Sequence, residues 1–115
     1  MRRGDIVAVS LNSVHGSEAN KTRPAVIVSN DAANAAAASL GHGVITVVPL
    51  TSSISRVHPF QVLLPASDTG LRHDSKARAE QVRSVAVERV GKRIGQLSQS
   101  LADQLDQALR VHLGL

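Results

Sequence analysis

Cysteine, tryptophan and tyrosine are absent from the 115-residue chain, and Phe60 is its one aromatic residue. The absence of cysteine excludes disulfides and metal sites built on thiolates. With so few aromatic side chains, the hydrophobic core must consist of valine, leucine, isoleucine and alanine, and we expect it to be small. Hydrophobic residues still make up 43% of the chain, which is enough for a folded core. At this length we expect one domain over residues 1–115.

No apolar run approaches the length of a membrane span. Arg2 and Arg3 are followed by Gly4 and Asp5, where a signal peptide would need an apolar segment. We therefore expect a cytoplasmic protein without a membrane partner. The net charge of +4 favours a polyanion as partner, although charge alone does not distinguish a nucleic acid from an acidic protein segment.

Apolar, β-branched segments bounded by turn residues predict several short strands, which together suggest a mainly β barrel. The segments are 5–11, 25–28, 44–51, 59–65 and 94–97. Pro49 is expected to place the end of its strand at an edge or a bulge. Between residues 74 and 86, small residues alternate with charged ones, as in a half-exposed strand. A helical turn is expected within 85–90.

Two helices are predicted from capping residues and apolar spacing. The alanine-rich stretch 32–40 follows the possible caps Asn30 and Asp31 and ends before Gly41. A second helix should begin after Ser98 and end near Leu113, before Gly114. Its expected apolar face comprises Leu101, Leu105, Ala108, Leu109 and His112.

The stretch from Arg23 to Val28 is the strongest functional candidate. Pro24 biases Arg23 toward an extended conformation, which holds its guanidinium at the mouth of a buried strand. A guanidinium in that place can bind an anion, and the alternative is a solvated charge at a strand end. In the 74–86 segment, Lys76 and Arg78 share one face, which either contacts phosphates or is simply solvated.

The five histidines do not form a recognisable site. They lie in unrelated segments, and none has the spacing of metal ligands, so no metal site is expected. Two histidines can act as a base and an acid on either side of a phosphate, but the spacing of these five does not support such a pair. Packing is the simpler explanation for His112.

Five short motifs in chain order resemble the MazF/PemK family of toxin endoribonucleases. They are Arg3-Gly4-Asp5, Gly16-Ser17-Glu18, Arg23-Pro24 with its strand ending Ser29-Asn30-Asp31, Leu50-Thr51-Ser52, and Asp74-Ser75 with Glu80-Gln81-Val82-Arg83. The resemblance covers nearly the whole chain. It implies an SH3-like β barrel with a C-terminal helix, usually a homodimer, that is the toxin of a type II toxin-antitoxin system.

The resemblance also implies the activity, the partners and the site residues. Such a toxin is a sequence-specific endoribonuclease that cleaves single-stranded RNA without a metal or another cofactor. An acidic, MazE-like antitoxin blocks its site. Arg23 would stabilise charge on the phosphate, Thr51 would donate a hydrogen bond, and Glu18 would act as a base or orient Arg23 unless it is a solvated loop carboxylate. RNA-binding positions are expected at Ser17, Ser52, Ser53, Ser75, Lys76, Gln81 and Arg83.

The chain departs from the family pattern in its first strand, where Val7, Ala8 and Ser10 replace the usual aromatic and acidic residues. Those replacements remove surfaces on which a base could stack, each worth about 1 to 3 kcal/mol. One alternative function is a gyrase inhibitor of the CcdB type, which acts through a C-terminal Trp-Gly-Ile tip, whereas this chain has Leu113-Gly114-Leu115. The other alternative is a barrel that binds RNA without cleaving it.

Overall fold

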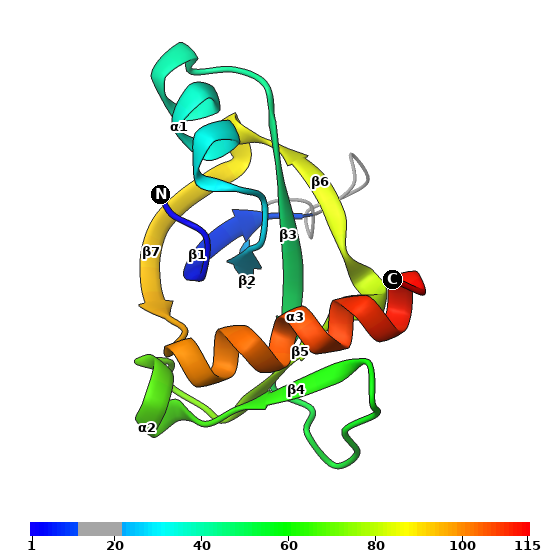
Figure 1. Ribbon diagram of the computed structural model, residues 1–115. Coiled ribbons are helices and arrows are strands. Elements are labelled where there is room, and N and C mark those ends of the chain that lie inside the picture. The colour runs from blue at the N-terminus through cyan, green and yellow to red at the C-terminus, as the bar shows by residue number, and fades with distance from the viewer. Residues whose placement is uncertain (12–21) are drawn as a thin grey trace.

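The fold is organised around one antiparallel sheet (Figure 1). In the computed structural model, which describes residues 1–11 and 22–115, the strands follow the order β4-β5-β3-β2-β1-β7, and β6 also pairs with β3. The strands are β1 (Asp5–Ser10), β2 (Thr22–Ile27), β3 (Val44–Thr51), β4 (Gln61–Leu64), β5 (Ser75–Arg78), β6 (Arg83–Ala86) and β7 (Val90–Gln96). The helices are α1 (Asp31–Leu40), α2 (Ala66–Thr69) and α3 (Gln99–Leu113), with short 3₁₀ turns η2 (Ala79–Gln81) and η3 (Val87–Arg89). The predicted mainly β fold with a C-terminal helix is confirmed.

The second half of β2, from Ala25 to Ile27, is buried on both faces, as the apolar run 25–28 predicted, although the strand begins earlier, at the exposed Thr22. Successive side chains of a strand point to opposite faces, so Val26 enters one hydrophobic cluster while Ala25 and Ile27 enter another. In β3, Val48 and Leu50 join the cluster of Val26, and Ile45 and Val47 join the second one. The core is therefore divided by the sheet into two small parts, both built from aliphatic side chains.

Helix α3 covers the first of these clusters. Leu101, Leu105 and Ala108 are buried against it, and α3 runs alongside β4 (Figure 1). The hydroxyl of Ser98 accepts a hydrogen bond from Leu101 N at 3.2 Å, which confirms the predicted N-cap. The prediction for His112 was wrong: it is exposed, because the apolar stripe in contact with the sheet ends before the last turn of the helix.

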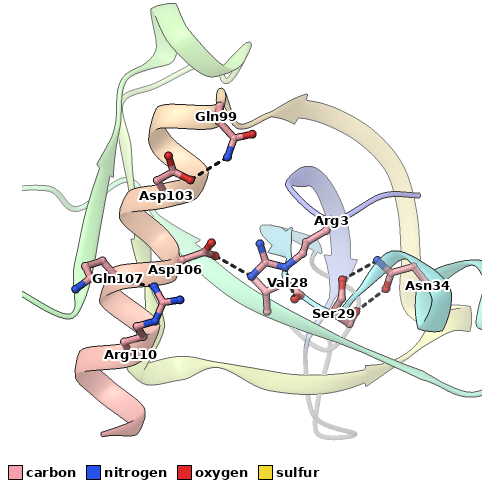
Figure 2. A network of polar contacts seen from close by, with 9 residues as sticks. All are labelled: Arg3, Val28, Ser29, Asn34, Gln99, Asp103, Asp106, Gln107 and Arg110. Atoms are coloured by element: carbon pink, nitrogen blue, oxygen red, sulfur yellow. Dashed lines mark hydrogen bonds and ion pairs between the residues drawn. The ribbon is translucent and has the colours of Figure 1, made fainter. Parts of the chain in front are cut away.

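Helix α1 begins and ends where its sequence predicted. Asn30 accepts a hydrogen bond from Ala33 N at 2.8 Å, and Gly41 ends the helix with a φ of 72°. The helix is held to the sheet by Asn34, which is fully buried and donates to the carbonyl of Ser29 at 2.9 Å (Figure 2).

The N-terminal segment joins three elements through Arg3. Its backbone N–H donates to Asp31 Oδ1 at 2.7 Å, and this hydrogen bond lowers the pKa of that carboxyl below its usual value. The guanidinium donates to the carbonyl of Val28 at 2.8 Å and to Asp106 of α3 at 2.8 Å (Figure 2). These contacts tie the chain before β1 to α1, to the end of β2 and to α3.

Several predicted boundaries differ from the structure. Pro49 lies inside β3, which has strands on both sides, rather than at an edge or a bulge. On one side β3 pairs with β6 up to Val47 and with β5 from Leu50 onward, so Pro49 falls between the two partners. The carbonyl of Thr46 accepts hydrogen bonds from the chain after β2, so it points toward β2. The backbone polar groups of successive residues point to opposite sides of a strand, so the nitrogen of Pro49, three residues later, points away from β2, between the ends of β6 and β5. The N–H that proline lacks is therefore not needed for a hydrogen bond between β3 and any of its partner strands.

Two other segments were only partly predicted. The last strand begins at Val90 rather than at Ile94, and the alternating segment is broken by η2 into β5 and β6. The expected alternation in β5 is confirmed, with Ser75 and Ala77 buried and Lys76 and Arg78 half-buried. Among the described residues, no helix is both long and apolar enough to cross a membrane.

Candidate functional site

A pocket of about 600 Å³ opens where β2 begins and β3 ends. Its polar lining comes from four parts of the chain: the start of β2, the end of β3, the loop before β5, and β5 itself. These side chains are Arg23, Thr51, Ser52, Arg72, His73, Ser75 and Arg78. Apolar groups, including Leu11, Leu71 and Ile94, complete the wall.

The register of the sheet brings Arg23 and Thr51 together. Strands β2 and β3 are antiparallel with Ala25 opposite Pro49, and continuing this register by two residues sets Arg23 opposite Thr51. Thr51 is in turn opposite Lys76 of β5. Residues directly opposite each other in an antiparallel pair have side chains on the same face. A guanidinium, a hydroxyl and an ammonium group therefore follow one another across one face of the sheet.

The hydroxyl of Thr51 is oriented by its own loop. The backbone N–H of Ser53 donates to Thr51 Oγ1 at 3.2 Å. A hydroxyl has one donor and two acceptor sites, so this bond leaves the proton of Thr51 available for a ligand. Thr51 can thus donate to an anion held by Arg23.

The pocket is cationic. Arg23, Arg72 and Arg78 line it, and its described lining contains no acidic side chain. The Nε of Arg78 is buried and makes no hydrogen bond within the described residues. Arginine presents its donors in a planar fork that matches phosphate oxygens. The arrangement is suited to a phosphate group.

A second pocket of about 390 Å³ adjoins the first and shares Thr51 and Arg78 with it. It is lined by Thr51, Ser53, His58, Phe60, Gln61, Lys76, Arg78 and Glu80. The rings of His58 and Phe60 stack in parallel, with 5.1 Å between their centroids. Lys76 Nζ donates to the carbonyl of Arg56, which holds the ammonium group at the rim.

The residues predicted from sequence fall into three groups in the structure. Ser52 and Ser75 line the first pocket with Arg23 and Thr51, and Ser53 and Lys76 line the second. Gln81 and Arg83 are exposed and line neither. Arg83 instead donates from Nη1 to the carbonyl of Leu11 at 3.3 Å. Ser17 and Glu18 lie outside the described residues.

Sequence reasoning missed two residues of the first pocket, Arg72 and His73, and left the role of Arg78 open. Their position in the sequence could have indicated them, because Arg72 and His73 directly precede the Asp74-Ser75 motif. Within residues 1–11 and 22–115, no three histidine, aspartate or glutamate side chains are grouped as ligands of a metal ion.

Comparisons with known proteins identify the family of the chain. Residues 2–113 match the model of the PemK-like, MazF-like toxins of type II toxin-antitoxin systems. The chain is 60% identical over 115 residues to the endoribonuclease MazF9 of Mycobacterium tuberculosis, covering 100% of this chain and 98% of that protein. It is 29% identical over 116 residues to the endoribonuclease EndoA of Bacillus subtilis, covering 100% and 96%.

Solved structures share the fold. An endoribonuclease in complex with its cognate antitoxin, from a mycobacterial species, superimposes with a TM-score of 0.77 at 24% identity, covering 100% of this chain and 96% of that one. A MazE-MazF structure from Deinococcus radiodurans gives a TM-score of 0.75 at 22% identity, with coverage of 100% and 96%. The resemblance seen in the sequence motifs is thereby confirmed. The chain belongs to the PemK-like, MazF-like toxin family of type II toxin-antitoxin systems.

Proposed function

We propose that this toxin is a metal-independent, sequence-specific endoribonuclease that cleaves single-stranded RNA and so inhibits translation and growth. The observation that carries the proposal is the meeting of Arg23 and Thr51 in one cationic pocket, through the register of β2 and β3. The names of the relatives, MazF9 and EndoA, support the same activity.

The chemistry follows from the groups in the pocket. RNA carries its own nucleophile, the 2′-hydroxyl, whose oxygen attacks the adjacent phosphorus while the bond from phosphorus to O5′ breaks. Negative charge grows on the non-bridging oxygens in the transition state. Arg23 and Arg78 line the pocket and can bind these oxygens, and Thr51 can add a hydroxyl donor. Because the substrate supplies the nucleophile, no metal-bound water is needed.

The second pocket extends this site along the RNA. Lys76 at its rim is placed for a neighbouring phosphate, and the stacked rings of His58 and Phe60 offer a surface for a base. Ser52 and Ser53 supply hydroxyls for base edges or phosphates, whereas Ser75, whose hydroxyl donates to the carbonyl of His73, can only accept from a base. Roles in RNA binding remain proposals for Ser17, Gln81 and Arg83, and a role as base or as partner of Arg23 remains one for Glu18.

We further propose an acidic antitoxin as protein partner, a homodimer as the working form, and the cytoplasm as the location. A cationic pocket suits an acidic segment as well as RNA, so the antitoxin can inhibit by occupying the same groups. The antitoxin in the mycobacterial complex and the MazE in the Deinococcus radiodurans structures support a partner of this kind. The cytoplasm is where its RNA substrate is found.

The test is to incubate purified protein with a long single-stranded RNA in excess EDTA and to map the ends of the fragments. Wild-type protein should make discrete cuts, and Arg23→Ala should be slower by about 10²- to 10³-fold or more, because a donor to the charged phosphate oxygens is lost. Lys92→Ala is the control, since Lys92 is exposed on β7 and does not line either pocket. An unchanged rate for Arg23→Ala, or complete inhibition by EDTA, would contradict the proposal.

The same assay separates the alternatives. A binding-only barrel would retain the RNA in a gel-shift experiment and leave it intact. The gyrase-inhibitor reading is not favoured by the match to the PemK-like, MazF-like family.

A further inference from the structure

The proposed reaction needs a proton acceptor, and the described pocket offers one. The 2′-hydroxyl must lose its proton as it attacks phosphorus. Guanidinium groups, here those of Arg23, Arg72 and Arg78, are poor bases, and so are the hydroxyls of threonine and serine. Among the described residues that line the first pocket, His73 alone carries an imidazole, the side chain that most often serves as a general base in proteins.

The loop that carries His73 is anchored on both sides. The hydroxyl of Ser75, a buried residue of β5, donates to the carbonyl of His73 at 3.1 Å. The carboxylate of Asp74 accepts a hydrogen bond from Ala66 N at the start of α2 at 2.8 Å. Leu71 N donates to Thr69 Oγ1 at 3.3 Å. These bonds fix the backbone of the loop, whereas His73 itself is exposed and open to RNA.

The charged groups around His73 come from two strands and from its own loop. Arg23 comes from β2, Arg78 from β5, and Arg72 and Asp74 are its neighbours in the loop. Of these, the three arginines line the same pocket as His73, while the Asp74 carboxylate is engaged by the α2 backbone. A phosphate bound by the arginines would therefore lie in the same pocket as His73.

We propose that His73 is the general base of this endoribonuclease, an inference that rests on the proposed function. A ring nitrogen of neutral His73 takes the proton of the 2′-hydroxyl as O2′ forms its bond to phosphorus. The bond from phosphorus to O5′ breaks, and O5′ takes a proton from water. The products are a 2′,3′-cyclic phosphate and a 5′-hydroxyl, and His73 returns its proton to solvent. Arg23 and Thr51 keep their roles in stabilising the phosphate.

The test compares His73→Gln with wild-type protein on a short RNA that contains one cleavage site. His73→Gln should lower kcat by about 10²- to 10⁴-fold, because a glutamine side chain cannot accept the proton. Affinity for the same RNA with a 2′-deoxy group at the cut should stay within about twofold, since the arginines still bind the phosphate. His42→Gln is the control, because His42 lies in the turn after α1 and lines neither pocket.

Two further measurements distinguish a catalytic role of His73 from a structural one. The wild-type rate should rise with pH as the general base loses its proton, and His73→Gln should lack that rise. Imidazole added to the buffer should restore part of the rate of His73→Ala and none of the rate of Arg23→Ala.

The outcomes that overturn the inference differ from those that overturn the proposed function. If wild-type protein cuts RNA in EDTA and His73→Gln has the same rate and pH profile, His73 is not the base and the endoribonuclease assignment stands. A substrate with sulfur in place of O5′ needs no acid for its leaving group. If His73→Gln cuts that substrate at the wild-type rate, His73 serves the leaving group and the base assignment is wrong. If wild-type protein leaves all RNA intact, the proposed function itself fails.

Discussion

Arg23 and Thr51 are placed by different chemical constraints. Pro24 keeps Arg23 extended at the start of β2, and the partner strand β3 ends at Thr51 on the same side of the sheet. Thr51 is half-buried and accepts from Ser53 N, so its hydroxyl has a defined orientation before any ligand arrives. Donors that are oriented in advance stabilise a transition state most effectively, because they need no reorganisation during the reaction.

Two replacements of Thr51 test whether its hydroxyl, rather than the size of its side chain, contributes to the reaction. Thr51→Val should lower kcat by about 10²- to 10³-fold, because valine has the same volume and cannot donate to the phosphate. Thr51→Ser should retain most of the wild-type kcat, since it keeps the hydroxyl. The measurement is single-turnover cleavage of a short RNA, with thermal melting to show that both variants fold. Equal rates for the two variants would show that the hydroxyl does not act in the reaction.

The elements around the site are held by close backbone contacts as well as by side chains. At Gly95 in β7, a Cβ atom would lie 2.3 Å from the carbonyl oxygen of Thr69 at the end of α2. The strand therefore approaches α2 more closely than any residue with a side chain would permit. This contact supports the same loop that carries His73, since the chain passes from α2 into that loop.

Gly95→Ala should lower the free energy of unfolding by about 1 to 3 kcal/mol, because the added methyl group forces β7 and α2 apart. Urea unfolding followed by circular dichroism measures the change. Lys92→Ala on the same strand is the matched control and should leave the midpoint nearly unchanged, since its side chain is exposed. Equal midpoints for the two variants would mean that β7 can shift without cost.

The distribution of charge over the molecule matters more for function than its net value of +4. Arg23, Arg72 and Arg78 line one pocket, and Lys76 lies beside it in the adjoining one. A concentration of cations around a groove attracts a polyanion from a distance and makes binding sensitive to salt. The same surface serves RNA and, as we propose, an acidic antitoxin.

Salt titration can identify the charges that contact phosphates. Binding of an uncleavable RNA should weaken with salt, and each phosphate contact to a single strand contributes about 0.7 to the slope of log K against log salt. Lys76→Gln should reduce the slope by about that amount, whereas Lys92→Gln should leave it unchanged. If the two variants lower the slope equally, binding depends on overall charge and not on the pocket.

Local patterns determined much of the fold in advance. The run 25–28 predicted a buried strand, and Asn30, Gly41, Ser98 and Gly114 marked the ends of two helices correctly. These features depend on residues within a few positions of one another, which the sequence shows directly. Pro49, His112 and the start of β7 were misjudged, because their surroundings depend on which strand or core lies beside them.

By itself, the sequence determined the kind of fold, the family resemblance and the importance of Arg23 and Thr51 as candidates. Only the tertiary structure decided which polar groups share a pocket. It placed Arg72, His73 and Arg78 beside Arg23 and Thr51, and it left Gln81 and Arg83 outside. The physical reason is that pocket membership follows from strand register and loop anchoring, which join residues about 50 positions apart and leave no periodic signal in the chain.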